Sequence, residues 1–367
     1  MRLRTAQPSA GNTPMKPPTV NDLDYLGALL HGRRSRLAEG GRLEALWRLR
    51  NVSELGRALY PDTDFRTAAE LQRRLVGDLA RELASCLKHL EGAGAALLAW
   101  MLARFQVENM KVLVRGFANH LPFEALEPHL VPLPHGLALD VEAPLQAQSA
   151  DDFIARLPPG MPRRWLRKAA SSYREQTRTF FLEAALDCGY FEELLARTEL
   201  LPDQDKEPVG PLSFQEVDTF HLMLALRGKF HYGLTPEVLE PLHVRGSKIS
   251  TERFATMSAD ADPLTTASRA VGRALDKLPS SPATAAGAEP FDLAVFEGLA
   301  WERFLRLANR VFRRSHMGLP TVLGYVGIRR VEVANLITVS EALATGLPAE
   351  AIHVRLIPRK ELEPANV

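Results

Sequence analysis

The stretch from Val331 to Pro358, VEVANLITVSEALATGLPAEAIHVRLIP, decides how the whole chain is interpreted, because its second half occurs three times. The copies begin at residues 121, 234 and 347, so they are evenly spaced and align without a gap. A leucine opens each copy, a glutamate follows three positions later, and apolar residues match further along. Similarity at a fixed period is the signature of a repeated architecture. The copies are residues 121–132 (LPFEALEPHLVP), 234–245 (LTPEVLEPLHVR) and 347–358 (LPAEAIHVRLIP).

A polar pair precedes each copy on a predicted helix. Its two members are three residues apart, which puts both side chains on one face of a helix. Apolar residues surround each pair, so each predicted helix has a polar notch beside a core stripe. A proline and a glutamate then announce the next helix start. The notch pairs are Gln106 with Asn109, Asp218 with His221, and Glu332 with Asn335.

The period makes each unit the size of a domain. A chain of 367 residues with 46% hydrophobic residues is long and apolar enough for three units of this size, each with a modest core. Proline-rich residues 1–21 predict a disordered tail, and residues 257–290, rich in Ala, Ser, Thr, Asp and Pro, predict a linker that contains one short helix. The predicted repeats are residues 22–140, 141–256 and 291–367.

Hydrophobic spacing predicts helices throughout the chain. The clearest lies over residues 68–90, where leucines recur at strict four-residue intervals from Leu71 to Leu87 with charges between them. Convincing alternating strand patterns are absent. The predicted fold class is therefore all-α, with a helical bundle repeated three times.

The charge balance gives no global reason to bind nucleic acid or acidic lipid, since 45 basic residues face 44 acidic ones. Cys86 and Cys188 fall in separate apolar helical segments, which predicts buried thiols in a reducing compartment. Neither a membrane-spanning run nor a secretory signal is visible, so we expect a cytoplasmic protein.

Three local basic clusters interrupt this balance. Each is either a solvated helix face or a partner contact, and the sequence leaves both interpretations open. The clusters are Arg33, Arg34 and Arg36; Arg163, Arg164, Arg167 and Lys168; and Arg310, Arg313 and Arg314.

No residue pattern typical of catalysis, metal binding or nucleotide binding occurs. His221 and His231 are ten residues apart, and no HExxH or paired CxxC spacing is present. The glycines of EGAGAALLAW follow a predicted helix instead of a strand, which argues against a phosphate loop. We therefore expect no catalytic residue, metal or cofactor. The notch pairs could be catalytic carboxylates, but their threefold recurrence favours a structural or cavity-lining role.

Four stretches together resemble a known family. The chain is similar to the C subunit of the V/A-type ATPases, whose eukaryotic relative is the d subunit of the V-ATPase, from about Asp22 to Pro358. The stretches are NVSELGRALYPDTDF (51–65), FQVENMKVLVRG (105–116), EVDTFHLMLALRGKFHYGL (216–234) and GYVGIRRVEVANLITVSEALATGLPAEAIHVRLI (324–357).

Several positions depart from the family pattern. In the first repeat Gln106 replaces the acid of an Asp-x-x-Asn-Leu-Lys helix, whereas Asn109 and Lys111 match. In the second repeat Asp218 matches, and His221 stands where asparagine is usual. Arg329 and Arg330 replace a Lys-Glu pair in the third repeat, where Glu332 and Asn335 match. These departures mark a divergent member of the family.

The resemblance implies three similar domains around a pseudo-threefold axis, which form a funnel. Such a funnel seats the tip of a rotor shaft and rests on a membrane proteolipid ring. It implies a single, non-catalytic central-stalk subunit in an ATPase or ATP synthase that transports protons or sodium, on the cytoplasmic side of the membrane. We then expect the six notch residues to line the central cavity and bind a partner.

Two other function classes remain open. The chain could be a free-standing helical scaffold for protein interactions, which the absence of neighbouring genes for a rotary motor would favour. An enzyme with an unrecognised helical active site is the third class, and the lack of a catalytic constellation argues against it.

Overall fold

The computed structural model describes residues 20–134, 141–176, 178–271, 293–353 and 355–358, and every regular element within these ranges is a helix. The predicted all-α fold class is therefore confirmed for the described residues. Most of the predicted tail, residues 1–19, lies outside them. None of the helices in the described ranges is both long and apolar enough to span a membrane.

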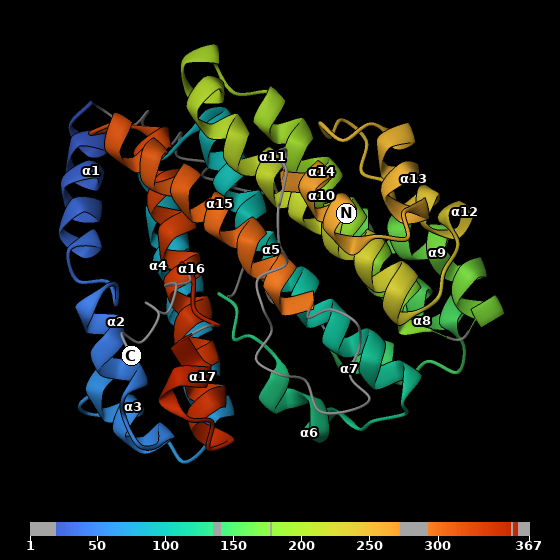
Figure 1. The fold of residues 1–367 in the computed structure, drawn as a ribbon, viewed down its shortest axis with the longest axis horizontal. Coiled ribbons are helices and arrows are strands. Elements are labelled where there is room, and N and C mark those ends of the chain that lie inside the picture. Colours follow the sequence, from blue (N-terminus) through green and yellow to red (C-terminus); the bar gives the residue numbers. More distant parts are fainter. Residues whose placement is uncertain (1–19, 135–140, 177, 272–292, 354, 359–367) are drawn as a thin grey trace, which may run out of the picture.

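Three long helical hairpins form the body of the molecule (Figure 1). A turn of only a few residues joins the two helices of each. The hairpins are α4 (Ala68–Leu87) with α5 (Gly92–Ala118), α10 (Thr179–Glu199) with α11 (Asp203–Leu226), and α15 (Leu293–Arg314) with α16 (Leu319–Ala344).

Shorter helices surround these hairpins. One turn of π-helix, η3, directly extends α11. The shorter elements are α1 (Val20–Arg34), α2 (Gly41–Trp47), α3 (Val52–Leu59), α6 (Phe123–Leu126), η1 (Glu127–His129), α7 (Glu142–Leu145), α8 (Ala150–Arg156), α9 (Met161–Gln176), η3 (Arg227–His231), α12 (Pro236–Leu239), η4 (Glu240–Leu242), α13 (Thr251–Ala259), α14 (Pro263–Val271) and α17 (Ala349–His353).

The hairpins pack one after another in a closed ring. The second helix of each hairpin lies against the first helix of the next: α5 on α10, α11 on α15, and α16 on α4. One apolar core continues through all three hairpins, so the limits of the three predicted domains stay a prediction. An arginine–glutamate ion pair crosses each contact. These pairs are Arg115–Glu183 (2.5 Å), Arg227–Glu297 (3.3 Å) and Arg329–Glu82 (3.1 Å).

Helix α4 shows how the sequence produces these elements. The Thr67 side chain caps its N-terminus by accepting a hydrogen bond from the backbone N–H of Glu70. Its predicted leucine stripe faces the core, with Leu71, Leu75 and Leu79 at most 3% exposed. Both cysteines are buried and free, as predicted.

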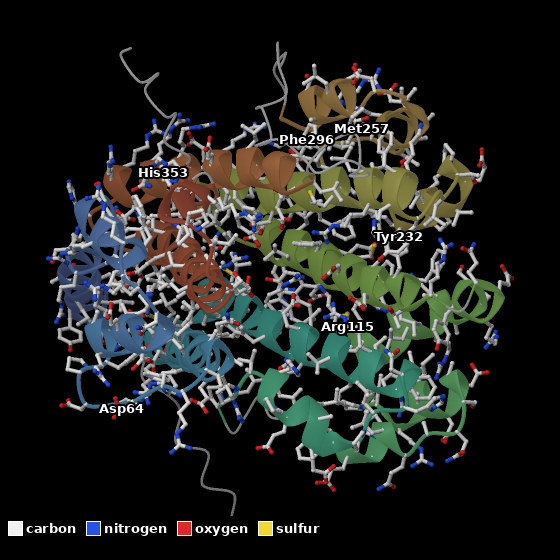
Figure 2. All side chains as sticks on the ribbon, turned by 60° about the horizontal axis from the view of Figure 1, so that its bottom comes forward. Asp64, Arg115, Tyr232, Met257, Phe296 and His353 are labelled. Carbon is white, nitrogen blue, oxygen red and sulfur yellow. The ribbon has the colours of Figure 1, made fainter. Side chains whose placement is uncertain are left out.

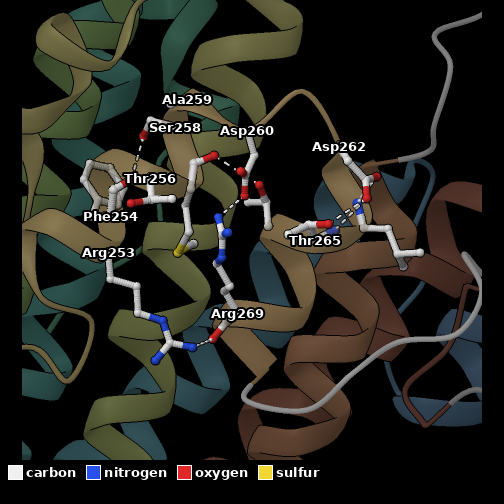
Figure 3. Close-up of polar contacts among 12 residues, drawn as sticks. Arg253, Phe254, Thr256, Ser258, Ala259, Asp260, Asp262, Thr265 and Arg269 are labelled. Carbon is white, nitrogen blue, oxygen red and sulfur yellow. Dashed lines mark hydrogen bonds and ion pairs between the residues drawn. The ribbon is translucent and has the colours of Figure 1, made fainter.

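The segment predicted as a linker begins inside packed helices. Residues 257–271 form the end of α13 and all of α14, and both helices pack against α11. Figure 3 shows the polar contacts that hold the two helices together: Arg269 pairs with Asp260, and Arg253 donates to the carbonyl oxygen of Arg269 at 2.6 Å. Phe254 and Ala267 are fully buried, which explains why this part packs. Residues 272–290 lie outside the described residues.

Helices α15 and α16 approach most closely at two glycines. A Cβ atom added to Gly324 would lie 2.6 Å from the backbone nitrogen of Phe312, and one added to Gly327 would lie 2.8 Å from the Cβ of Ala308. Real contacts of this kind are essentially never so short, and a backbone atom cannot move aside easily. The glycines therefore set the distance between these two helices.

We expect Gly324→Ala to lower the free energy of unfolding by about 1–3 kcal/mol, because it overpacks this contact. Gly32→Ala is the matched control, since nothing lies within 4 Å of its added Cβ in helix α1. The control should stabilise the chain by up to about 1 kcal/mol through helix propensity. Urea unfolding of both variants measures the difference, and equal effects would contradict the close-packing argument.

Candidate functional site

The second helix of each hairpin ends in a similar way. A leucine N–H reaches back to a carbonyl of the last helical turn, and the residue before that leucine has a left-handed backbone, as in a Schellman ending. The bonds are Leu121 to Gly116 (2.9 Å), Leu234 to Gly228 (2.8 Å) and Leu347 to Ala342 (2.9 Å). The left-handed residues are His120 (φ 51°), Gly233 (φ 65°) and Gly346 (φ 68°).

The asparagines of the first and third notch pairs clamp the chain that follows each ending. The Asn109 amide accepts from the N–H of Val131 at 2.7 Å and donates to the carbonyl of Val131 at 3.0 Å. Asn335 makes the same two bonds to Ile357, at 2.9 and 2.7 Å. Both asparagines are at most 5% exposed. Each therefore fixes a segment that lies 22 residues downstream.

In the second hairpin, His221 makes one of the two corresponding hydrogen bonds. Its Nε2 accepts from the N–H of Val244 at 3.0 Å, so Nδ1 carries the proton of the neutral ring. Nδ1 has no hydrogen-bond partner within the described part of the chain. Complete burial, and then the neighbouring His243, lower the pKa of His221 to about 3. The ring thus stays neutral at physiological pH.

The clamp of the second hairpin reaches one residue further along the chain, since 23 residues separate its two partners instead of 22. The π-turn η3 lies between His221 and Val244, and a π-turn accommodates one more residue than an α-turn. It explains why the notch residues of this hairpin align with the others only after a one-residue shift. The downstream leucine and the β-branched apolar residue ten positions after it keep the even spacing of the three copies.

The first members of the notch pairs differ among themselves. Gln106 is half-buried. Glu332 accepts from the N–H of Ala38 and pairs with Arg329. Asp218 is 9% exposed, and its Oδ1 has no hydrogen-bond partner among the described residues. Burial raises the pKa of Asp218 to about 6, although three nearby cations oppose this shift.

The predicted site residues are thus mostly internal. Five of the six are buried, and the structure shows them bracing helix ends or lying in the core. A role of these six residues in partner binding stays a prediction.

We expect Asn335→Ala to lower the free energy of unfolding by about 1–3 kcal/mol, because it leaves the N–H and carbonyl of Ile357 without their partner. Thr338→Ala is a suitable control, since that exposed hydroxyl bonds only its own helix. Thermal unfolding measures both. Equal stability of the two variants would show that the clamp contributes nothing.

Asp218 should make stability depend on pH. Its folded pKa is about 6 and its ordinary value is 3.8, so the folded state binds the proton more tightly and stability falls as pH rises between these values. We therefore compare the free energy of unfolding of Asp218→Asn with that of the parent chain at two pH values. We expect the variant's value, relative to the parent's, to be about 2–3 kcal/mol higher at pH 7.5 than at pH 4. Denaturant unfolding at both pH values measures this difference, and a difference that does not change with pH would contradict the prediction.

A cavity of about 720 Å³ lies inside the ring, between α5, α10, α11, α15 and α16. Two of its lining residues, Arg115 and Tyr232, are labelled in Figure 2. The lining contains as many Arg and Lys as Asp and Glu side chains, and His231 lies beside them. They are Arg104, Lys111, Arg115, Arg227 and Arg330, with Glu108, Glu183, Asp187, Glu216 and Glu297. None of the six notch residues is among the residues that line this cavity.

The lining contains a buried ion pair. Arg330 donates two hydrogen bonds to Glu216, at 2.7 and 2.9 Å, and Glu216 is only 5% exposed. The guanidinium also lies over the rings of Trp301 and Phe304. This bidentate geometry joins the second hairpin to the third.

A second cluster joins the first hairpin to the second. Asp187 on α10 pairs with Arg104 at 2.6 Å and with Lys111 at 2.7 Å, both on α5. Burial raises the pKa of Asp187, but the two cations outweigh this effect and hold the pKa below its usual value. Asp187 therefore stays ionised, and the contact between α5 and α10 is electrostatic as well as apolar.

These cavity residues were not predicted from the sequence, although three of them occupy a shared position relative to the notch pairs. Arg104, Glu216 and Arg330 each lie five residues before the second member of a notch pair. Their charges differ, so an alignment of the three repeats shows no shared residue type at this position. Closer to solvent, Arg115 and Arg227 lie six residues after Asn109 and His221, and both side chains are about half exposed.

Within the cavity the described charged side chains are arranged mainly as ion pairs. Within the described ranges no three His, Cys, Asp or Glu side chains are grouped as metal ligands would be. The acidic groups of the lining face basic partners, which favours structural ion pairs and contacts with another charged surface.

A family model described as ATP synthase (C/AC39) subunit matches residues 26–355, a range that contains all three hairpins. The chain belongs to this family. The match confirms the resemblance found in the sequence.

Relatives of this C/AC39-family chain include three proteins named as the C subunit of an A-type ATP synthase. The one from Methanosphaera stadtmanae is 24% identical over 267 residues, covering 70% of this chain and 66% of that protein. The one from Methanobrevibacter smithii is 24% identical over 263 residues (70% and 67%), and the one from Methanothermobacter thermautotrophicus is 27% identical over 240 residues (64% and 60%). The matches span about two thirds of the length of these relatives.

Proposed function

We propose that this chain is a non-catalytic central-stalk subunit of a V/A-type rotary ATPase or ATP synthase. In this role it joins the rotor shaft to the membrane proteolipid ring during proton or sodium transport, as a single copy on the cytoplasmic side. The observation that carries the proposal is the family match, because it covers the whole ring of hairpins and its charged cavity.

The ring suits a part that passes torque. Close-packed interiors resist deformation, and here the packing is cyclic, so each hairpin is supported on both sides. Largely buried ion pairs also join α16 to α4 and to α11. The proposal includes three units around a pseudo-threefold axis in the form of a funnel, and the order of contacts around the ring supports it.

The shaft tip is the partner that we assign to the charged cavity. Half-exposed Arg115 and Arg227 carry charge outward, where an acidic or polar surface could meet them. Three of the notch residues, Asn109, His221 and Asn335, would then contribute to partner binding indirectly. Their clamps hold the segments that follow α5, α11 and α16, and each of these helices contributes residues to the cavity lining.

The proposed function is tested by rebuilding the motor with and without this chain in vesicles. We expect a complex that lacks the chain to hydrolyse ATP without ion pumping, and added chain to restore pumping. The purified chain alone should not hydrolyse ATP. Full pumping without the chain, or failure of the chain to join the complex, would instead favour a free-standing protein.

The role of the cavity can be tested separately with Arg115→Ala combined with Arg227→Ala. Exposed ion pairs contribute little to stability, so this variant should fold and yet bind the shaft at least tenfold more weakly. Arg48→Ala combined with Arg57→Ala removes the same charge from other exposed ion pairs and should bind normally. Equal binding by both variants would place the shaft contact outside the cavity.

A further inference from the structure

A second hollow lies at the start of α9, on the outer side of the hairpin ring, and its wall is strongly basic. Its volume is about 430 Å³. Pro159 and Gly160 form one part of the wall, and four cations from the first two turns of α9 form the rest. This α9 cluster consists of Arg163, Arg164, Arg167 and Lys168.

Among the residues that the structure describes, none supplies a counter-charge to the α9 cluster. Within the described ranges, no carboxylate lies at ion-pair distance from any of its four cations. The acidic residues of the neighbouring helix α8 are already engaged, since Asp151 pairs with Arg174 and Asp152 pairs with Arg156. The cluster is thus a local excess of positive charge on a chain whose formal net charge is +1.

Two of the four cations are held in place. The Arg163 guanidinium donates to the carbonyl oxygens of Ala155 and Leu157 at the end of α8, while its buried Nε has no partner among the described residues. The Lys168 ammonium lies 4.0 Å from the ring centre of Trp165, a side chain that is only 4% exposed. Arg164 and Arg167 are exposed. The hollow is therefore surrounded both by hydrogen-bond donors that are held in place and by donors that are exposed to solvent.

Folding alone does not account for this placement. The N-terminus of a helix carries the positive end of its dipole, so cations in the first turns are unfavourable and also repel one another. The first turn of α9 contains no acidic residue that would offset the effect. An anion in the hollow would weaken the repulsion among the cations and would interact favourably with the positive end of the helix dipole.

We propose that this hollow binds a phosphate-bearing anion. Guanidinium groups match phosphate oxygens in a bidentate fork, and an ammonium adds a compact charge. The phosphate could belong to a free compound or to a phospholipid headgroup, because the same four cations would recognise either. The proposal concerns a surface away from the charged cavity and does not depend on the rotary function.

The first experiment titrates pyrophosphate into the purified full chain by calorimetry. The test variant combines Arg164→Gln, Arg167→Gln and Lys168→Gln, and it keeps Arg163 because that side chain braces α8. The matched control combines Arg310→Gln, Arg313→Gln and Arg314→Gln, three exposed cations at the end of α15 that do not line the hollow. We expect at least tenfold weaker binding by the α9 variant and less than a twofold change in the control.

Melting midpoints without ligand supply a second readout. Removing cations from the start of α9 should raise the midpoint, whereas removing them from the end of α15 should lower it, because the two helix ends have opposite polarity. A lowered midpoint in the α9 variant would contradict the argument that a ligand explains its cations.

Vesicles separate the two sources of phosphate. The chain is mixed with phosphatidylcholine vesicles and with vesicles that also contain phosphatidylglycerol. A pyrophosphate response without vesicle binding supports a free phosphate compound, and selective binding to the anionic vesicles that the α9 variant loses supports a headgroup. No response to either probe, or an equal loss in both variants, overturns the proposal.

Discussion

Two consecutive arginines of α16 hold the third hairpin to both of its neighbours. Arg329 reaches Glu82 on α4, and Arg330 reaches Glu216 on α11. Removing one partner of a buried pair typically costs about 3–5 kcal/mol, since the other charge is left uncompensated. Two neighbouring residues that point to different sides of one helix therefore anchor α16 on both of the hairpins beside it.

Local patterns in the sequence were sufficient for the elements themselves. The leucine stripe of α4 follows from a spacing of four residues, and the helix endings just before residues 121, 234 and 347 follow from the copied leucines. Such features involve residues that are neighbours along the chain, or that recur in type. The all-α fold class and the family resemblance could be obtained in this way.

The candidate site could not be predicted to the same degree, because its residues are defined by partners far away in the sequence. Glu216 and Arg330 are 114 residues apart, and no local pattern shows that they meet. Burial was equally hidden: Asn335 looks like a residue available for binding until its two bonds to Ile357 are known. A polar residue that binds backbone groups at long range has the same sequence signature as one that binds a partner.

The π-turn η3 has a consequence for the history of the chain. If the three hairpins descend from one ancestral unit, the second has gained one residue between its histidine and its downstream leucine, and the wider turn has absorbed that residue within the helix. Neither the clamp on one side nor the loop on the other had to move. Between the notch and the copied leucine, comparisons among the units should therefore place the one-residue gap at residues 227–231, inside regular structure, although gaps are ordinarily assigned to loops.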